Sequence, residues 1–421
     1  MKKKPKRENN FKISDFYLWF DNRKTQIVSD MISLINIDTQ SPFESRCFPW
    51  VKKYLKNLDF KIKFEKFHPK IKSHPSFSPH SKSKILNNRG NLRAIFKKVD
   101  NSKKTVLFNC HLDVVPPTND FANAFNGYIE RNKIFGRGAC DTKNNLIMLG
   151  EALRFLKEYD IELTKNPSID LVIEEEIGGN GTLSTVMHGI AADEVICLEP
   201  TNLNIFRGHR GCISFDIDVR GMSVHMGNDK DGINAIEWTI EIIKILKDLE
   251  RELLCEARRS VDFKCWKRPL QLNVGIISGG EWSGTVPERC RLSCDLGFLP
   301  DYSLKQIEKI IEMKCRSVKN DWISKNIKIS FSGLRNDAYI VDKNIDLVRD
   351  MVRCCINNRV DQSGVYGWNV SCDARYYAKN ANLPVIIFGS GNLINAHSAH
   401  EYIDLDELKR GACILAEYLS N

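Results

Sequence analysis

The sequence predicts an α/β fold with a mainly parallel sheet, into which a smaller α+β sandwich is inserted. Short apolar strands alternate with amphipathic helices through the first half of the chain, which is typical of parallel sheets. Near Gly211 the pattern changes to an alternation of apolar and polar residues, as in half-buried antiparallel strands. The chain has 421 residues, a length at which two domains are more common than one.

The first half of the chain supplies the alternating elements. Apolar residues at helical spacing predict helices over 19–35, 48–58 and 142–159. Short apolar runs predict strands over 91–96, 105–108, 168–173 and 194–198. A stretch rich in Pro, Ser, His and Lys predicts a surface loop over 67–89.

The inserted segment begins with the alternating strand 212–219. Further patterns there predict a helix over 233–256, strands over 270–277 and 290–296, and a helix over 304–318. The chain then returns to the first unit with a helix over 345–356, a buried strand over 384–388 and a last helix over 405–419. The expected organisation is a basic tail over 1–14, a main domain over 15–210 and 331–421, and an inserted domain over 211–330.

Composition excludes several classes of protein. Of the residues, 42% are hydrophobic and 27% charged, which is ordinary for a folded protein. The formal charge is +9, but no basic cluster with interleaved aromatic residues is present, so no nucleic-acid partner is expected. The 14 cysteines form no C-x-x-C pair and are expected to be reduced thiols. Neither a signal peptide nor an apolar run of about 18 residues is visible, so we expect a cytoplasmic protein without a membrane span.

Histidines and carboxylates follow the predicted strands in a regular manner. Ligands in α/β folds gather at the carboxyl ends of strands, and the candidates at these positions are His111, Asp113, Asp141, Glu174 to Glu176, Glu199 and His397. Taken singly, each has an ordinary explanation: Asp141 as a helix N-cap, for example, or the three glutamates as a solvated strand end. Together, imidazole and carboxylate donors suit zinc, or cobalt or manganese, and their number suits two ions that share one bridging carboxylate.

Five spaced segments carry a family resemblance. They are 108–116 (FNCHLDVVP), 136–143 (GRGACDTK), 174–179 (EEEIGG), 198–201 (LEPT) and 396–402 (AHSAHEY). They resemble the co-catalytic zinc amidohydrolase and metallopeptidase family, which includes acetylornithine deacetylase, succinyl-diaminopimelate desuccinylase, aminoacylase and glutamate carboxypeptidase. Two segments of the insert, 221–225 (GMSVH) and 232–237 (GINAIE), are similar to the same family.

The resemblance implies a zinc-peptidase-like catalytic domain with an inserted dimerisation or lid domain. It also implies a set of ligands for two divalent metal ions. Asp141 would bridge the ions, His111 and Glu199 would complete one site, and Glu176 and His397 would complete the other.

Two further residues receive catalytic roles from the resemblance, and the position of a third in the chain gives it a supporting role. Glu175 would be the general base that acts on a metal-bridged water. His225 would cross to the active site of the partner in a homodimer and stabilise the oxyanion. Asp113, two residues from His111, is placed to hold the second ring nitrogen of that histidine.

The chain departs from the family pattern at several positions. Asn144 and Asn145 stand where the family usually has two small residues, and Gly284 stands where many members have asparagine. Gly297 replaces an arginine that binds the substrate carboxylate in several relatives. Arg375 is the nearest substitute for that arginine, with a purely structural role as the alternative.

These features predict a metal-dependent hydrolase of amide bonds, most specifically an N-acyl amino acid deacylase. The expected substrate is a small N-acyl amino acid or a short peptide. A dipeptidase or carboxypeptidase with the same residues is one alternative. A catalytically inactive binding relative is the other.

Overall fold

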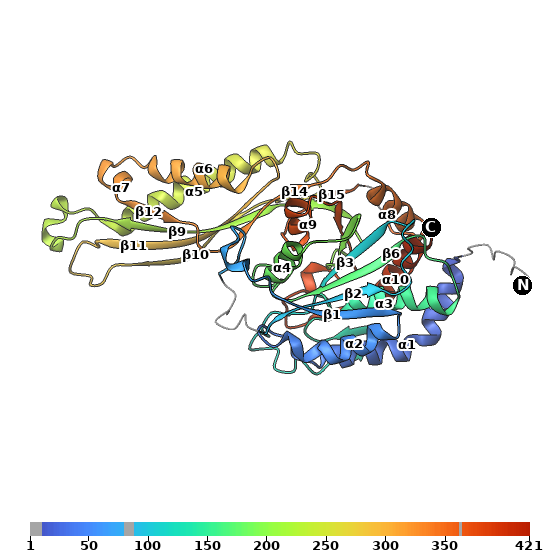
Figure 1. Ribbon diagram of the computed structural model, residues 1–421. Coiled ribbons are helices and arrows are strands. Elements are labelled where there is room, and N and C mark those ends of the chain that lie inside the picture. Colours follow the sequence, from blue (N-terminus) through green and yellow to red (C-terminus); the bar gives the residue numbers. More distant parts are fainter. Residues whose placement is uncertain (1–10, 80–87, 362–363) are drawn as a thin grey trace, which may run out of the picture.

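A computed structural model describes residues 11–79, 88–361 and 364–421, and it confirms the α/β fold class. Figure 1 shows a large body built on a central sheet, from which a narrower arm of strands and helices extends. The arm contains the segment that the sequence predicts as an insertion. Among the described residues, no helix combines the length and apolar character needed to cross a bilayer.

The body contains a nine-stranded sheet with the order β1-β2-β6-β3-β7-β16-β8-β14, and β15 also pairs with β8. Its middle part, β6-β3-β7-β16, is parallel, and the strands outside it are mostly antiparallel. The strands are β1 (Phe60–Lys66), β2 (Gly90–Phe96), β3 (Thr105–His111), β6 (Asn166–Val172), β7 (Glu194–Cys197), β8 (Phe206–His209), β14 (Tyr339–Ile340), β15 (Tyr366–Trp368) and β16 (Val385–Ile387).

Helices cover this sheet and bury its apolar side chains. Helix α3 packs against α1 and α10, α10 packs against α8, and α4 packs against α9. The helices of the body are α1 (Ile13–Ile35), α2 (Phe48–Lys56), α3 (Lys143–Glu158), α4 (Asn180–His188), α8 (Asp346–Asn357), α9 (Ala374–Asn380) and α10 (Leu405–Ser420). Helix α3 is buried almost all round, because it lies between other helices and the sheet.

The arm has its own antiparallel sheet, with the order β10-β11-β9-β12 and with β13 paired to β9. Side chains of β9 alternate between buried and half-buried, as its sequence predicts, and the buried ones pack with α5 and α6 in a separate core. The elements of the arm are β9 (Gly211–Arg220), α5 (Ala235–Ala257), β10 (Leu272–Gly279), β11 (Arg289–Phe298), α6 (Leu304–Arg316), α7 (Asp321–Lys325), β12 (Ile327–Ser330) and β13 (Arg335–Asn336).

A small third sheet joins distant parts of the chain beside the central one. It has the order β17-β5-β4, from β4 (Tyr128–Glu130), β5 (Lys133–Phe135) and β17 (Tyr402–Asp404). Its pairing brings the segment before β17 next to the segment after β5, since the backbone N–H of Gly136 donates to the carbonyl of Glu401 at 3.1 Å. Two of the motifs found in the sequence therefore meet here.

Several elements differ from the sequence prediction. Helix α1 begins at Ile13, six residues before the predicted start and inside the stretch assigned to the tail, of which residues 1–10 lie outside the described part. Strand β1 escaped prediction because its sequence, FKIKFEK, is rich in charges, as an edge strand allows. Helices α4 and α9 were missed because they are short. The predicted loop 67–89 is described in part, and its residues 80–87 lie outside the description.

Candidate active site

The predicted metal ligands and Glu175 converge at one edge of the parallel strands. His111 is the last residue of β3, Glu174 to Glu176 follow β6, and Glu199 follows β7. Asp141 lies two residues before α3, and His397 lies in the segment after β16. The carboxyl ends of adjacent parallel strands lie side by side, so residues separated by up to 286 positions in the chain become neighbours.

Two groups of three potential metal ligands share Asp141. In the first, Nε2 of His111 lies 3.0 Å from Oδ1 of Asp141 and 3.9 Å from Oε2 of Glu199. In the second, Nε2 of His397 lies 3.4 Å from Oδ2 of Asp141 and 3.1 Å from Oε2 of Glu176. The ligand atoms of each group lie within 4.8 Å of one another, and Asp141 directs one oxygen to each group.

The electrostatics of this cluster fit bound cations. Burial, followed by like charge, raises the pKa of Glu176 and, more strongly, those of Glu175 and Glu199. Hydrogen bonds with Asp141 and Glu176 raise the pKa of His397 to about 10. Four carboxylates surround two imidazoles, so the cluster has an excess of negative charge that the protein itself does not neutralise. Imidazole and carboxylate donors with excess negative charge are what divalent ions such as zinc require.

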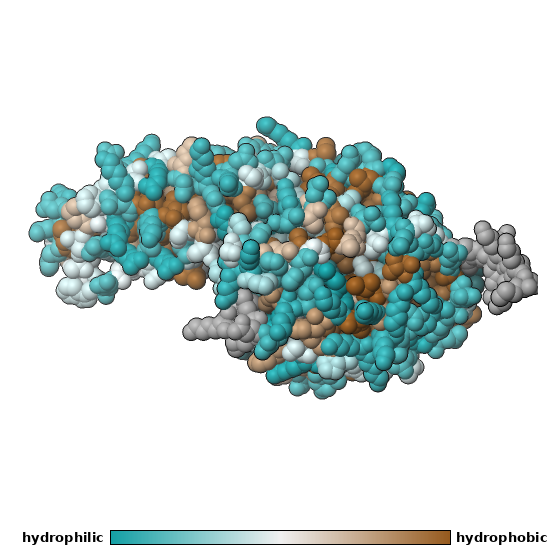
Figure 2. Space-filling model, in the orientation of Figure 1, coloured by the Kyte–Doolittle hydropathy of each residue, from teal (hydrophilic) through white to brown (hydrophobic). Residues whose placement is uncertain are grey.

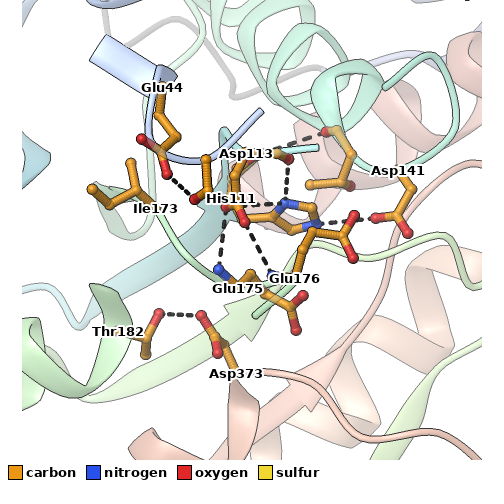
Figure 3. A network of polar contacts seen from close by, with 12 residues as sticks. Glu44, His111, Asp113, Asp141, Ile173, Glu175, Glu176, Thr182 and Asp373 are labelled. Carbon is orange, nitrogen blue, oxygen red and sulfur yellow. Dashed lines mark hydrogen bonds and ion pairs between the residues drawn. The ribbon is translucent and has the colours of Figure 1, made fainter. Parts of the chain in front are cut away.

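Asp113 connects the histidine strand to the glutamate loop (Figure 3). Its carboxylate accepts hydrogen bonds from the backbone N–H groups of Glu175 and Glu176, at 3.2 and 3.0 Å. The expected contact with Nδ1 of His111 is made more closely by the backbone carbonyl of Asp113, at 3.0 Å, than by its carboxylate, at 3.6 Å. Asp113 therefore orients the ring through its backbone and the two glutamates through its side chain.

Glu175 belongs to neither group of three. Its side chain is partly buried beside that of Asp373, whose charge is the second cause, after burial, of the raised pKa of Glu175. Asp373 is itself buried and accepts a hydrogen bond from the hydroxyl of Thr182 at 2.5 Å (Figure 3). Sequence reasoning overlooked both neighbours, although Asp373 stands two residues before the Arg375 that it singled out.

Glu401 is a third residue that the sequence motifs did not single out. One carboxylate oxygen accepts the backbone N–H groups of Cys140 and Asp141, at 2.9 and 3.1 Å, and the other contacts Nη1 of Arg137 at 2.6 Å. Arg137 and Glu401 are almost fully buried. The ion pair thus holds the loop that presents Asp141. Both residues stand inside motifs that the sequence analysis had marked, and that was the available signal.

His225 does not join the cluster within one chain. It is exposed in the arm, where its Nδ1 accepts a hydrogen bond from the backbone N–H of Gly227 at 3.1 Å. Its backbone forms an isolated antiparallel β-bridge with Thr285. Among the described residues, no contact links His225 to the metal-ligand groups. Its role stays a prediction that requires a second copy of the chain.

The two positions linked to substrate carboxylate differ in their surroundings. Arg375 is buried and donates to the carbonyls of Cys372 and Gly178, at 2.5 and 3.0 Å. Its role as a carboxylate ligand stays a prediction. A side chain at Gly297 would begin 2.6 Å from Nη1 of Arg210, so Arg210 occupies the space above this glycine. A larger side chain at position 297 would therefore require Arg210 to move.

A metal-dependent hydrolase of amide or peptide bonds is the class that this fold and this pair of histidine–carboxylate groups define. The chain belongs to the family described as Peptidase family M20/M25/M40, whose profile matches residues 107–421.

Named relatives and solved structures agree with this assignment. Acetylornithine deacetylase of Buchnera aphidicola subsp. Schizaphis graminum is 26% identical over 349 residues, which cover 79% of this chain and 84% of the relative. N-formyl-4-amino-5-aminomethyl-2-methylpyrimidine deformylase of Bacillus subtilis is 26% identical over 346 residues, or 75% and 78% of the two chains. A tripeptidase from Staphylococcus aureus has a similar fold, with a TM-score of 0.73 at 16% identity and coverage of 94% and 98%. Human carnosine dipeptidase 1 has a TM-score of 0.70 at 16% identity, with coverage of 97% and 99%.

Proposed function

We propose that this chain is an N-acyl amino acid deacylase that uses two divalent ions, with zinc as the native metal and cobalt or manganese as possible substitutes. The observation that carries the proposal is the sharing of Asp141 between two groups of three ligands, with Glu175 left outside both. Two of the relatives, by their names, remove an acyl group from nitrogen, which favours a deacylase over a peptidase.

The protein residues divide the chemistry between them. His111 and Glu199 would hold one ion, Glu176 and His397 the other, and Asp141 both. When bound, the two cations polarise the amide carbonyl and lower the pKa of water. Glu175 then accepts the proton of the attacking water and delivers it to the departing amine. A carboxylate whose pKa is raised by burial and by a neighbouring charge accepts a proton more readily than an ordinary glutamate, which suits the first of these steps.

The arm supports the further proposal of a homodimer in which His225 acts in the partner's site. Strand β10 lies at the edge of its sheet, so one side of its backbone is unpaired there. Ile276 and Ile277 on this strand are 63% and 50% exposed, and Trp282 just beyond it is 68% exposed. In the orientation of Figure 2, hydrophobic side chains are visible on the arm among mostly hydrophilic ones. Exposed apolar residues along a free strand edge favour pairing with a second copy.

A cytoplasmic location is part of the proposal. All 14 cysteines, each of which lies in the described part of the chain, are free thiols. Free thiols in this number are typical of a reducing compartment. A small N-acyl amino acid, rather than a nucleic acid or a membrane, is the proposed partner.

The decisive experiment combines metal analysis with a substrate panel. Purified protein is analysed for bound metal and assayed with N-acetyl, N-formyl and N-succinyl amino acids, dipeptides and longer peptides. We expect about two ions per chain and the highest kcat/KM on an N-acyl amino acid. A preference for dipeptides or carboxy-terminal residues would replace the proposal with a peptidase. Two bound ions without any hydrolysis would indicate an inactive binding relative.

A further inference from the structure

A third group of potential ligands lies directly behind the hydrolytic site. The thiols of Cys197 and Cys372 and a carboxylate oxygen of Glu199 lie within 4.8 Å of one another. Cys197 ends β7, two residues before Glu199, and Cys372 lies two residues before α9. All three side chains are at least 96% buried, and both cysteines are free thiols.

A buried hydroxyl without a partner lies next to these thiols. Tyr339, on β14, is 3% exposed, and its hydroxyl makes no hydrogen bond. Burial, followed by the charges of Cys372 and Cys197, raises the pKa of this hydroxyl, so both thiols lie near it. Buried polar groups almost always have a partner, and an unsatisfied one requires an explanation. A thiolate that binds a cation would accept this hydrogen bond, as groups around metal sites commonly do.

The donor atoms select for a class of cation. Two sulfurs and one oxygen form a softer set than the nitrogen and oxygen donors around Asp141, and they suit thiophilic ions. In a tetrahedral site with Zn–S bonds of about 2.3 Å, two sulfurs stand roughly 3.8 Å apart. The donor atoms lie within 4.8 Å of one another in the structure, so the two sulfurs are at most about 1 Å further apart than in such a site. Binding would release the thiol protons to solvent.

We propose that Cys197, Cys372 and Glu199 form a separate site for a thiophilic divalent cation, of which Cd²⁺ or excess Zn²⁺ are examples. Glu199 is also one of the three ligands in the group with His111 and Asp141, where its oxygen lies 3.9 Å from Nε2 of His111. An ion on the sulfur side competes for this carboxylate and repels a cation on the other side. Occupation of the site therefore inhibits hydrolysis, a consequence that rests on the function proposed above.

Cadmium is the probe, because only thiolate ligands produce its sulfur-to-metal charge-transfer absorption. The parent protein carries Cys255→Ser and Cys265→Ser, which remove the two exposed thiols. Cys197→Ser and Cys372→Ser are compared in this background with Cys413→Ser, which removes a buried thiol outside the group. We expect one equivalent of cadmium to produce the band in the parent and in the Cys413 variant. Cys197→Ser and Cys372→Ser should each weaken cadmium binding by about 100-fold or more. This loss is at least as large as that usual for a residue that only hydrogen-bonds to a metal ligand.

Two results of the absorption measurements would overturn the site. One is absence of the band from the parent protein, and the other is a band of unchanged strength and affinity in both test variants. Cadmium NMR of the parent, whose chemical shift reports sulfur ligation, decides the question even if a variant fails to fold. A shift typical of nitrogen and oxygen ligands alone would refute the proposal.

Activity measurements separate this inference from the proposed function. Each protein is compared with its own rate before cadmium is added, and the test variants should lose part of the inhibition seen in the parent. Equal inhibition in all variants would refute the competition for Glu199. A cadmium band in a protein that hydrolyses no substrate of the panel would refute the proposed function and leave the cation site standing.

Discussion

Replacement of Glu175 by glutamine tests the general base most directly. The change keeps the shape of the side chain and removes its capacity to accept a proton. The backbone N–H of Glu175 is held by Asp113 at 3.2 Å, a contact that does not depend on the Glu175 side chain. Glu175 also lies outside both groups of metal ligands. We therefore expect the loop and the metal content to be unchanged in Glu175→Gln.

The expected loss follows from the role assigned to this residue. General acid–base catalysis contributes about 10²–10⁴-fold, so kcat should fall by at least about 100-fold, equivalent to about 2.7–5.5 kcal/mol over this range. KM should change little, because the proton moves in the reaction step and not in substrate binding. Steady-state kinetics on the preferred substrate, with metal analysis of the same sample, measure both quantities.

Glu176→Gln is the matched comparison for this prediction. It changes the adjacent glutamate, whose carboxylate lies 3.1 Å from Nε2 of His397, and it should lower metal content before it affects the chemistry. The reasoning would be refuted by a metal-replete Glu175→Gln protein whose kcat lies within about ten-fold of the unaltered enzyme, below the usual contribution of a general base. Loss of metal from Glu175→Gln but not from Glu176→Gln would mean that the two glutamates exchange roles.

Three further predictions address the remaining roles. Glu401→Gln should lower the free energy of unfolding, measured in urea, by about 3–5 kcal/mol, because Arg137 would be left buried without its counter-charge. A decrease below about 1 kcal/mol would contradict a stabilising role of this ion pair. Glu175→Ala and His225→Ala should each be nearly inactive alone. Their co-expression at equal levels should restore about a quarter of the activity, since half of the dimers are mixed and each mixed dimer has one complete site. No restored activity would place His225 within its own chain, and a His225→Ala protein near full activity would remove His225 from catalysis. Arg375→Ala should raise KM for carboxylate-bearing substrates by about 10–100-fold, the range of a hydrogen bond to a charged group, and an equal effect on amidated substrates would show that Arg375 only holds the carbonyls of its neighbours.

Much of the fold and of the site was accessible from local patterns. The alternation over 212–219 predicts a half-buried strand, and β9 has this burial pattern. The spacing over 405–419 predicts a helix, and α10 covers Leu405–Ser420. The convergence of His111, Glu176 and Glu199 follows from one rule, that adjacent parallel strands present their carboxyl ends together. Each of these inferences depends on a short segment and the period of its side chains.

Other features arise only when distant segments pack together. Asp141 faces His111 with one oxygen and His397 with the other. This arrangement depends on the segment of His397, which lies 256 residues further along the chain, packing next to Asp141. The hold of Glu401 on the Asp141 loop depends on the pairing of β17 with β5. The carboxylate of Asp113 binds two backbone N–H groups of the glutamate loop instead of making the closest contact with the ring beside it.

The division between the two kinds of information has a physical cause. Side-chain periodicity reflects which face of a single helix or strand is buried, and it is a property of the local sequence. The partner of a buried polar atom is selected by the packing of whole elements, since most such atoms pair with whichever donor or acceptor the fold brings near them. The motifs therefore predicted which side chains gather around Asp141, whereas the contacts that hold Asp141 and Glu175 in place, and the position of two thiols near Glu199, were decided by the tertiary structure.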